Sequence, residues 1–252
     1  MTPALLVFVF LGFVVEATAG FGATVVTLTL SAQILPVHEA LALLLPVNLL
    51  LSAYLLIRYR RAVDLRLLSR RVLPAMGLGM LGGLWLYELR DALAIKAIFG
   101  ALVLTLAGVE LWRMQRPAGS GGPLPPWRAR VALLGAGLIH GLFSCGGPLT
   151  VYVLSREGLD KARFRATLSA LWLILNLVLE LTYVRDGLIS ATTLRQSALL
   201  LAPLGLGLLV GEALHHRLET ERFRLWVFLL LAFSSATLLI RAALETARSW
   251  PV

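Results

Sequence analysis

Ten apolar runs, joined by short polar connections, dominate this sequence. They lie at about 3–19, 22–35, 37–57, 72–87, 92–112, 130–143, 147–155, 166–184, 197–214 and 225–244. Hydrophobic residues make up 58% of the chain and charged residues 15%, whereas soluble domains carry roughly 25% charged residues. A helix needs about 20 mostly apolar residues to cross a bilayer. The sequence therefore predicts an all-α polytopic membrane protein that has the lipid bilayer as a partner.

The two halves of the chain match each other, which predicts an internal duplication. Asn48 and Asn176 lie 128 residues apart, each in the third apolar run of its half. Near the start of each half the spacing is 124 residues, and it pairs Gly22 with Gly146 and Glu16 with His140. At the 128-residue spacing, five further residues of the first half pair with five of the second: Gly77, Gly79, Gly83, Lys96 and Arg113 with Gly205, Gly207, Gly211, Arg224 and Arg241.

Lysine and arginine counts predict how the two copies are oriented. We expect a first membrane repeat at 1–116, a linker of Gly and Pro at 117–129 and a second membrane repeat at 130–252. If the first two runs of each repeat form a hairpin, 17 basic residues fall on one side of the membrane and 6 on the other. If each pair instead forms one broken span, the split is 14 to 9. Because basic residues are enriched on the cytoplasmic side, inverted repeats are favoured, with a cytoplasmic linker and both termini outside.

Run lengths also favour hairpins. The runs 130–143 and 147–155 would reach only about 20 and 14 Å at 1.5 Å per residue, and the hydrocarbon core is about 30 Å thick. We therefore expect each repeat to open with a re-entrant or broken helical hairpin whose Gly-rich tip lies near the bilayer midplane. Whether run 3–19 spans fully stays open. Because it lacks a basic n-region, we expect it to be retained rather than cleaved as a signal peptide.

The hairpin tips are candidate substrate-binding sites. Glycine allows the chain to reverse and lets a ligand approach the backbone, and a helix that begins at a tip directs free N–H groups and its positive dipole end toward an anion. The alternative is that these glycines serve close helix packing. The candidate residues are Gly20, Phe21, Gly22, Ala23 and Thr24 at the first tip and Ser144, Cys145, Gly146 and Gly147 at the second.

Two pairs of polar residues add to this site. Asn48 and Asn176 lie near the middle of their runs, where an amide needs a hydrogen-bonding partner, either a substrate oxygen or a neighbouring helix. Glu16 and His140 are the titratable residues nearest the tips, and ionisable groups inside a membrane are costly and often functional. We predict that they couple transport to protons, with a neutral side chain bonded to a backbone carbonyl as the alternative.

Other classes of protein are disfavoured. The formal charge of +9 is spread over short clusters between apolar runs, without the basic module of a nucleic-acid-binding protein. Cys145 is the one cysteine, and no His-x-x-x-His spacing occurs, so we expect no metal and no other cofactor. The sequence holds no Gly-x-Ser-x-Gly, His-Glu-x-x-His or phosphate-loop motif, and we expect no enzyme activity.

The tips resemble those of the sulfite exporter TauE/SafE family. The resemblance rests on Gly20–Thr24, Ser144–Leu149, Tyr152–Gly158 and Phe164–Thr167. It implies a secondary transporter that exports sulfur-containing or organic anions, such as sulfite and sulfonates, across the bacterial inner membrane. The alternative is a non-transporting membrane assembly or biogenesis factor that binds partners through its basic loops. Which anion is carried, in which direction and with which coupling ion stays open.

Overall fold

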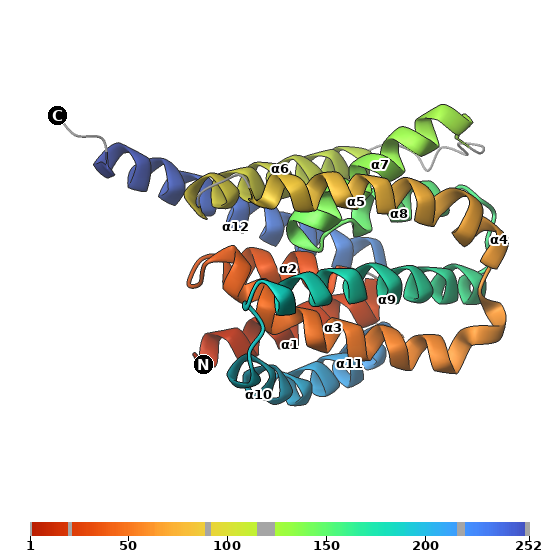
Figure 1. Cartoon of the computed structure of the whole chain (residues 1–252), viewed down its shortest axis with the longest axis horizontal. Helices are drawn as coiled ribbons and strands as arrows, with labels where there is room; N and C mark the ends of the chain where they lie inside the picture. The colour runs from red at the N-terminus through yellow and green to blue at the C-terminus, as the bar shows by residue number, and fades with distance from the viewer. Residues whose placement is uncertain (1, 20–21, 89–91, 115–123, 216–219, 250–252) are drawn as a thin grey trace. The chain divides into compact units, whose positions relative to one another are not determined.

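The computed structural model describes residues 2–19, 22–88, 92–114, 124–215 and 220–249, and every element in these ranges is a helix (Figure 1). Each of the ten predicted apolar runs coincides with at least one of these helices. The prediction of an all-α chain is therefore confirmed for the described residues.

Residue contacts divide the chain into two compact units. Unit 1 takes its residues from Met1–Ala40, Arg90–Gly119 and Leu200–Val252. Its helices are α1 (Pro3–Ala19), α2 (Ala23–Ser31), α6 (Ala92–Met114), α11 (Leu201–His215) and α12 (Thr220–Ser249). Within it, α1 packs on α2 and on α11, and α6 packs on α12.

Unit 2 takes its residues from Leu41–Leu89 and Ser120–Leu199. Its α-helices are α3 (Val37–Tyr59, whose first turn belongs to unit 1), α4 (Leu65–Leu67), α5 (Leu73–Glu88), α7 (Pro126–Phe143), α8 (Gly147–Leu154), α9 (Lys161–Arg185) and α10 (Ala191–Leu199). Between α3 and α5 lie a 3₁₀ turn, η1 (Arg60–Ala62), and a π-helical turn, η2 (Leu68–Val72). Each unit thus combines segments from both halves of the sequence, and the predicted repeats at 1–116 and 130–252 stay a prediction about duplication.

In unit 2, glycines bring α5 and α7 into direct backbone contact. A Cβ atom on Gly83 of α5 would meet the carbonyl oxygen of Leu138 on α7 and would lie 3.0 Å from the Cα atom of Gly141. On α7, a Cβ atom on Gly137 would meet the carbonyl oxygen of Met76. Small residues four apart let membrane helices approach this closely. Glycines of α5 and α7 therefore serve the close packing of this pair of helices.

In unit 1, α1 and α11 pack in the same way. A Cβ atom on Gly207 of α11 would lie 2.7 Å from the carbonyl oxygen of Phe10, and one on Gly211 would lie 2.6 Å from that of Val14. The corresponding pairs of unit 2 are Gly79 with Leu134 and Gly83 with Leu138. The glycines of the two units differ by 128 residues and their carbonyl partners by 124, which are the two spacings found in the sequence.

Helix boundaries differ from the apolar runs where end residues decide them. Helix α7 begins at Pro126, before the predicted run, because proline is well accepted in the first turn. Helix α9 begins at Lys161, since the side chain of Asp160 accepts a hydrogen bond from the backbone N–H of Arg163 at 2.9 Å. The ninth run is broken at Leu200, between α10 and α11. The predicted linker overlaps the start of α7, and its residues up to 123 lie outside the described residues.

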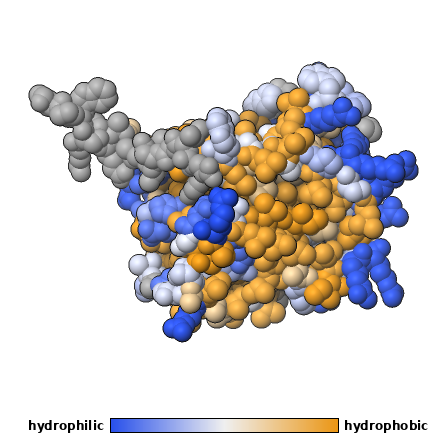
Figure 2. Space-filling view, in the orientation of Figure 1, coloured by the Kyte–Doolittle hydropathy of each residue, from blue (hydrophilic) through white to orange (hydrophobic). Residues whose placement is uncertain are grey.

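Five helical segments among the described residues are long and apolar enough to cross a membrane. They are Val37–Ala62, Ile95–Met114, Ala162–Arg185, Ala191–Leu214 and Leu225–Leu244. Large apolar side chains on them and on α5 are exposed, among them Ile57, Leu78, Trp226 and Phe233, each at least 67% exposed. Figure 2 shows apolar side chains over most of the face in view. Because water disfavours such a surface and lipid does not, this chain is suited to a bilayer.

Candidate functional site

The second tip reverses the chain at Ser144, which follows the last residue of α7. Ser144 has φ 53°, in the left-handed region, and its backbone N–H donates to the carbonyl oxygen of His140 at 2.7 Å. Its hydroxyl donates to Oδ1 of Asn176 on α9 at 3.0 Å. The expectation that a glycine makes this reversal is wrong at the second tip, because the hydrogen bond to Asn176 holds a serine in a conformation that glycine adopts more readily.

The glycines of the second tip have different surroundings. A Cβ atom on Gly146 would lie 2.5 Å from the carbonyl oxygen of Ala136 and 3.0 Å from Cβ of His140, whereas one on Gly147 would meet nothing within 4 Å. Gly146 therefore serves close packing, and Gly147 begins α8 in open space. Pro148 lies in the first turn of α8, where its missing N–H costs nothing. The first N–H groups of a helix have no partner within it, so the N–H groups of Gly147 and Leu149 point out of the helix end.

His140 lies directly beneath this tip. Its side chain is 2% exposed and stacks on Trp172 of α9, with ring centroids 5.3 Å apart and planes 19° apart. Neither Nδ1 nor Nε2 forms a hydrogen bond of good geometry in the part of the chain that the structure describes, and Asn176 is a polar side chain that interacts with the ring. Trp172 and Asn176 are one turn apart on α9, so the same face of this helix contacts both His140 and Ser144. Sequence reasoning missed Trp172, although its place four residues before Asn176 is a signal for a shared face.

The first tip is built differently. Gly22 precedes α2 and has φ 108°, a backbone conformation that favours glycine. The side chain of Glu16 on α1 accepts a hydrogen bond at Oε2 from the backbone N–H of Ala23, at 3.1 Å. A carboxyl group from within the chain therefore caps the N-terminus of α2. Ala23 is buried and Thr24 half-buried, and Gly20 and Phe21 lie outside the described residues.

The remaining predicted residues are buried in unit 2. Asn48 on α3 is 8% exposed and is engaged in an interaction, and Cys145 is a buried free thiol within the second tip. Unit 2 thus contains both asparagines, His140 and the second tip, while unit 1 contains Glu16 and the first tip. The hydrogen bonds bring Ser144 and Asn176 together, and the stacking on Trp172 brings His140 to the same face of α9. The place of Asn48 in the same site stays a prediction.

The five apolar helical segments of the described residues that are long enough to cross a bilayer indicate a multi-pass membrane protein. A comparison with models of protein families identifies the family of this membrane protein. The sulfite exporter TauE/SafE model matches residues 4–238. The chain therefore belongs to the sulfite exporter TauE/SafE family, as the tip residues suggested. Searches among curated proteins and among solved structures found no match.

Proposed function

We propose that this chain is a secondary transporter that exports small sulfur-containing or organic anions, such as sulfite or sulfonates, across the bacterial inner membrane. Membership of the sulfite exporter family supports the class of substrate, and the apolar helices support a pathway through a bilayer. In this proposal the anion binds at the second tip, where Ser144, Cys145, Gly146 and Gly147 adjoin His140 and Asn176.

One observation carries the proposal most: both ring nitrogens of His140 are buried, and neither forms a hydrogen bond of good geometry in the described part of the chain. An unpaired buried polar group costs about 1–3 kcal/mol, so a ligand that pairs with it gains free energy here. The N–H groups of Gly147 and Leu149 supply further donors. Asn176 accepts the hydrogen bond from Ser144 with Oδ1, which leaves its Nδ2 group to donate. An oxyanion is the ligand that can accept from such a set of donors.

The difference between the two tips also supports the second one as the anion site. Glu16 and His140 are equivalent in the predicted duplication, yet they present opposite chemistry to their helix ends. At the first tip the Glu16 carboxyl group accepts from the N-terminus of α2, and an ionised carboxylate there would repel a bound anion. At the second tip an imidazole takes its place. We also propose that Gly20 to Thr24 and Asn48 contact the anion. Because an ionised Glu16 would repel the anion at the first tip, this contact requires that Glu16 has taken up a proton.

The matching glycine contacts of α5 with α7 and of α11 with α1 support an origin by duplication. The 17 to 6 division of basic residues supports inverted copies, each opening with a re-entrant hairpin. In such transporters, substrates bind near the bilayer midplane at the ends of broken helices, which fits an anion site at the N-terminus of α8.

The test of the site is anion binding by purified wild type, Asn176→Leu and a control, Ser197→Ala. Ser197 is a buried hydroxyl of the same unit that donates to the carbonyl oxygen of Leu43 at 2.9 Å, away from the tip residues in sequence. Sulfite, thiosulfate, methanesulfonate and acetate are titrated, and the shift in unfolding temperature is measured. A ligand at 100 times its Kd stabilises a folded protein by about 2.7 kcal/mol, which gives a measurable shift.

We expect at least one of the sulfur oxyanions to stabilise wild type and Ser197→Ala, and to bind Asn176→Leu about tenfold more weakly or worse, as for the loss of a hydrogen bond to a charged group. Membrane hydrogen bonds contribute about 0.6 kcal/mol on average to stability, so Asn176→Leu is expected to stay folded. Equal binding by all three proteins would show that Asn176 is a packing residue and would contradict an anion site at the second tip.

A further inference from the structure

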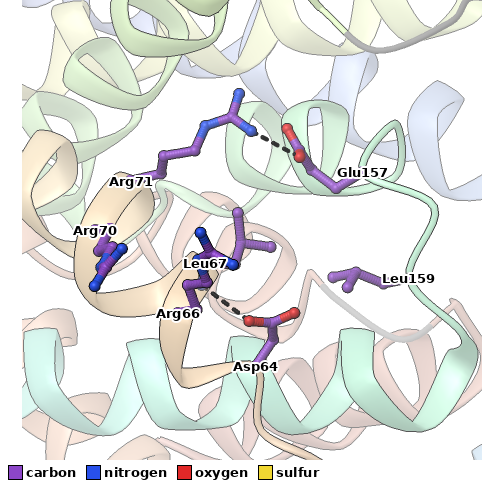
Figure 3. Close-up of a pocket in the computed structure, with 7 residues that line it drawn as sticks. All are labelled: Asp64, Arg66, Leu67, Arg70, Arg71, Glu157 and Leu159. Atoms are coloured by element: carbon purple, nitrogen blue, oxygen red, sulfur yellow. Dashed lines mark hydrogen bonds and ion pairs between the residues drawn. The ribbon is translucent and has the colours of Figure 1, made fainter.

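A second polar site lies in unit 2, in the basic segment between α3 and α5. It is a pocket of about 330 Å³, lined on one side by α4 and η2 and on the other by the connection from α8 to α9 (Figure 3). Figure 3 shows Arg66, Arg70 and Arg71 on one continuous stretch of helix, with Glu157 and Leu159 on the connection opposite. None of these residues belongs to the tips, so the pocket is separate from the proposed transport site.

The walls of the pocket are held in place by named contacts. Arg71 Nη1 lies 2.8 Å from Glu157 Oε2 and so ties η2 to the opposite connection. The backbone N–H of Asp64 donates to the hydroxyl of Thr167 on α9 at 3.0 Å, and Oδ1 of Asp64 accepts from the N–H of Leu67 at 2.9 Å. A site whose walls are already fixed binds a ligand with less loss of conformational entropy.

The charges of the pocket are unbalanced in one direction. Both of its carboxylates are engaged, Glu157 with Arg71 and Asp64 with the start of α4. Arg66 and Arg70 are exposed, and neither forms an ion pair with a residue that the structure describes. The π-helical turn contributes to this arrangement. This turn, Leu68–Val72, carries Arg70 and Arg71, which line the pocket together with Arg66.

We propose that this pocket binds a phosphate group, with Arg66 and Arg70 as its ligands and Arg71 as the positioning residue that holds the walls together. A guanidinium presents a planar pair of N–H donors that match two phosphate oxygens. The lining has three arginines and two carboxylates, so its net positive charge suits the single negative charge of a phosphodiester. The volume lies at the lower end of the range for small-molecule sites and suits a phosphate with a glycerol-sized substituent, which Leu67 and Leu159 would contact.

Two sources could supply this phosphate: an anionic lipid headgroup and a soluble phosphate. The segment 58–71 carries six arginines and overlaps the end of a candidate membrane span, Val37–Ala62, and basic pockets beside membrane helices bind lipid headgroups. The proposal does not rest on the transport function, because it uses no residue of the tips and its failure would leave that function untouched.

The experiment compares the full-length protein in detergent with two double variants. Arg66→Gln/Arg70→Gln removes both proposed ligands. Arg60→Gln/Arg61→Gln removes the same charge from η1, which lies earlier in the same segment and does not line the pocket. Phosphatidylglycerol and phosphatidylcholine are added in turn and bound lipid is counted by native mass spectrometry. In a separate arm inorganic phosphate is titrated at constant ionic strength and the unfolding temperature is followed.

We expect wild type and Arg60→Gln/Arg61→Gln to bind phosphatidylglycerol in preference to phosphatidylcholine, and Arg66→Gln/Arg70→Gln to bind it about tenfold more weakly, as for the loss of charge-assisted hydrogen bonds. Stabilisation of wild type by inorganic phosphate, lost in the same variant, would identify a soluble ligand instead and would equally support the pocket. Equal losses in the two double variants would reduce the effect to net charge and overturn the proposal. So would the absence of binding in both arms.

Discussion

At the scale of single residues, Glu16 and His140 bear most directly on function, because the predicted duplication pairs them. Both were predicted from their shared spacing, and the structure gives them different surroundings: the carboxyl group accepts from Ala23 N–H, while both imidazole nitrogens lie buried without a hydrogen bond of good geometry among the described residues. A proton on either group favours an anion. On His140 it adds a positive charge at the second tip, and on Glu16 it removes a negative charge at the first.

The first prediction is therefore that anion binding strengthens as the pH falls. Binding of methanesulfonate, which keeps its charge across the range, is measured from about pH 4, because burial disfavours the charged imidazole of His140, up to about pH 8. We expect wild type to bind more tightly at the acidic end, by a factor of about 5 to 150 as for typical site–site coupling, and His140→Gln or Glu16→Gln to lose most of this dependence. Unfolding temperatures of the variants serve as the control for folding. If both variants keep the wild-type profile, neither residue carries the coupling proton.

At the scale of helices, glycine spacing decides how closely α5 and α7 approach. Gly82 and Gly83 are neighbours on α5, yet a Cβ atom on Gly83 would meet the carbonyl oxygen of Leu138, and one on Gly82 would meet nothing within 4 Å. The obstacle at Gly83 is backbone, which cannot turn away as a side chain can. Two adjacent glycines on one helix thus differ in whether a side chain can be added without a clash.

We expect Gly83→Ala to lower the stability of the folded protein by about 1–3 kcal/mol, as overpacking does. Gly82→Ala is expected to be neutral or to stabilise by up to about 1 kcal/mol, because alanine favours helix over glycine. The unfolding temperature of each variant in the same detergent gives the comparison. Equal destabilisation by the two substitutions would contradict the backbone contact between α5 and α7.

Sequence patterns predicted the elements better than their contacts. The ten apolar runs located the helices because burial in lipid requires continuous apolar stretches. They did not predict the start of α7 at Pro126 or the break at Leu200, which depend on end residues and packing. The sequence also paired Gly79 with Gly207, but not Gly79 with Leu134, because pattern spacing reveals equivalence and not tertiary contact. The left-handed Ser144 was missed for the same reason, since its partner Asn176 lies 32 residues away.

At the scale of the whole molecule, each compact unit contains the hairpin of one sequence half together with helices of the other half. Unit 1 joins α1 and α2 to α11 and α12, and unit 2 joins α7 and α8 to α3 and α5. A cut in the predicted linker 117–129 would therefore divide both units.

The prediction at this scale concerns topology. The division of basic residues places the linker 117–129 on the cytoplasmic side and the C-terminus on the opposite side. In a Cys145→Ala background, a cysteine introduced at Ser120 is expected to react with a membrane-impermeant thiol reagent only after the membrane is opened, and one introduced at Val252 to react in intact cells. Reaction of both from the same side would contradict the inverted arrangement of the copies.

The most direct measurement is sulfite flux into liposomes that contain the purified protein. An anion site at the second tip predicts saturable flux down a sulfite gradient in wild type and in Ser197→Ala, and a loss of about tenfold or more at low sulfite in Asn176→Leu, as expected when a hydrogen bond to a charged group is removed. Folded wild-type protein that carries no anion under any gradient would contradict the transport function and favour an assembly factor. Saturable flux that is unchanged in Asn176→Leu would leave transport in place and contradict the site.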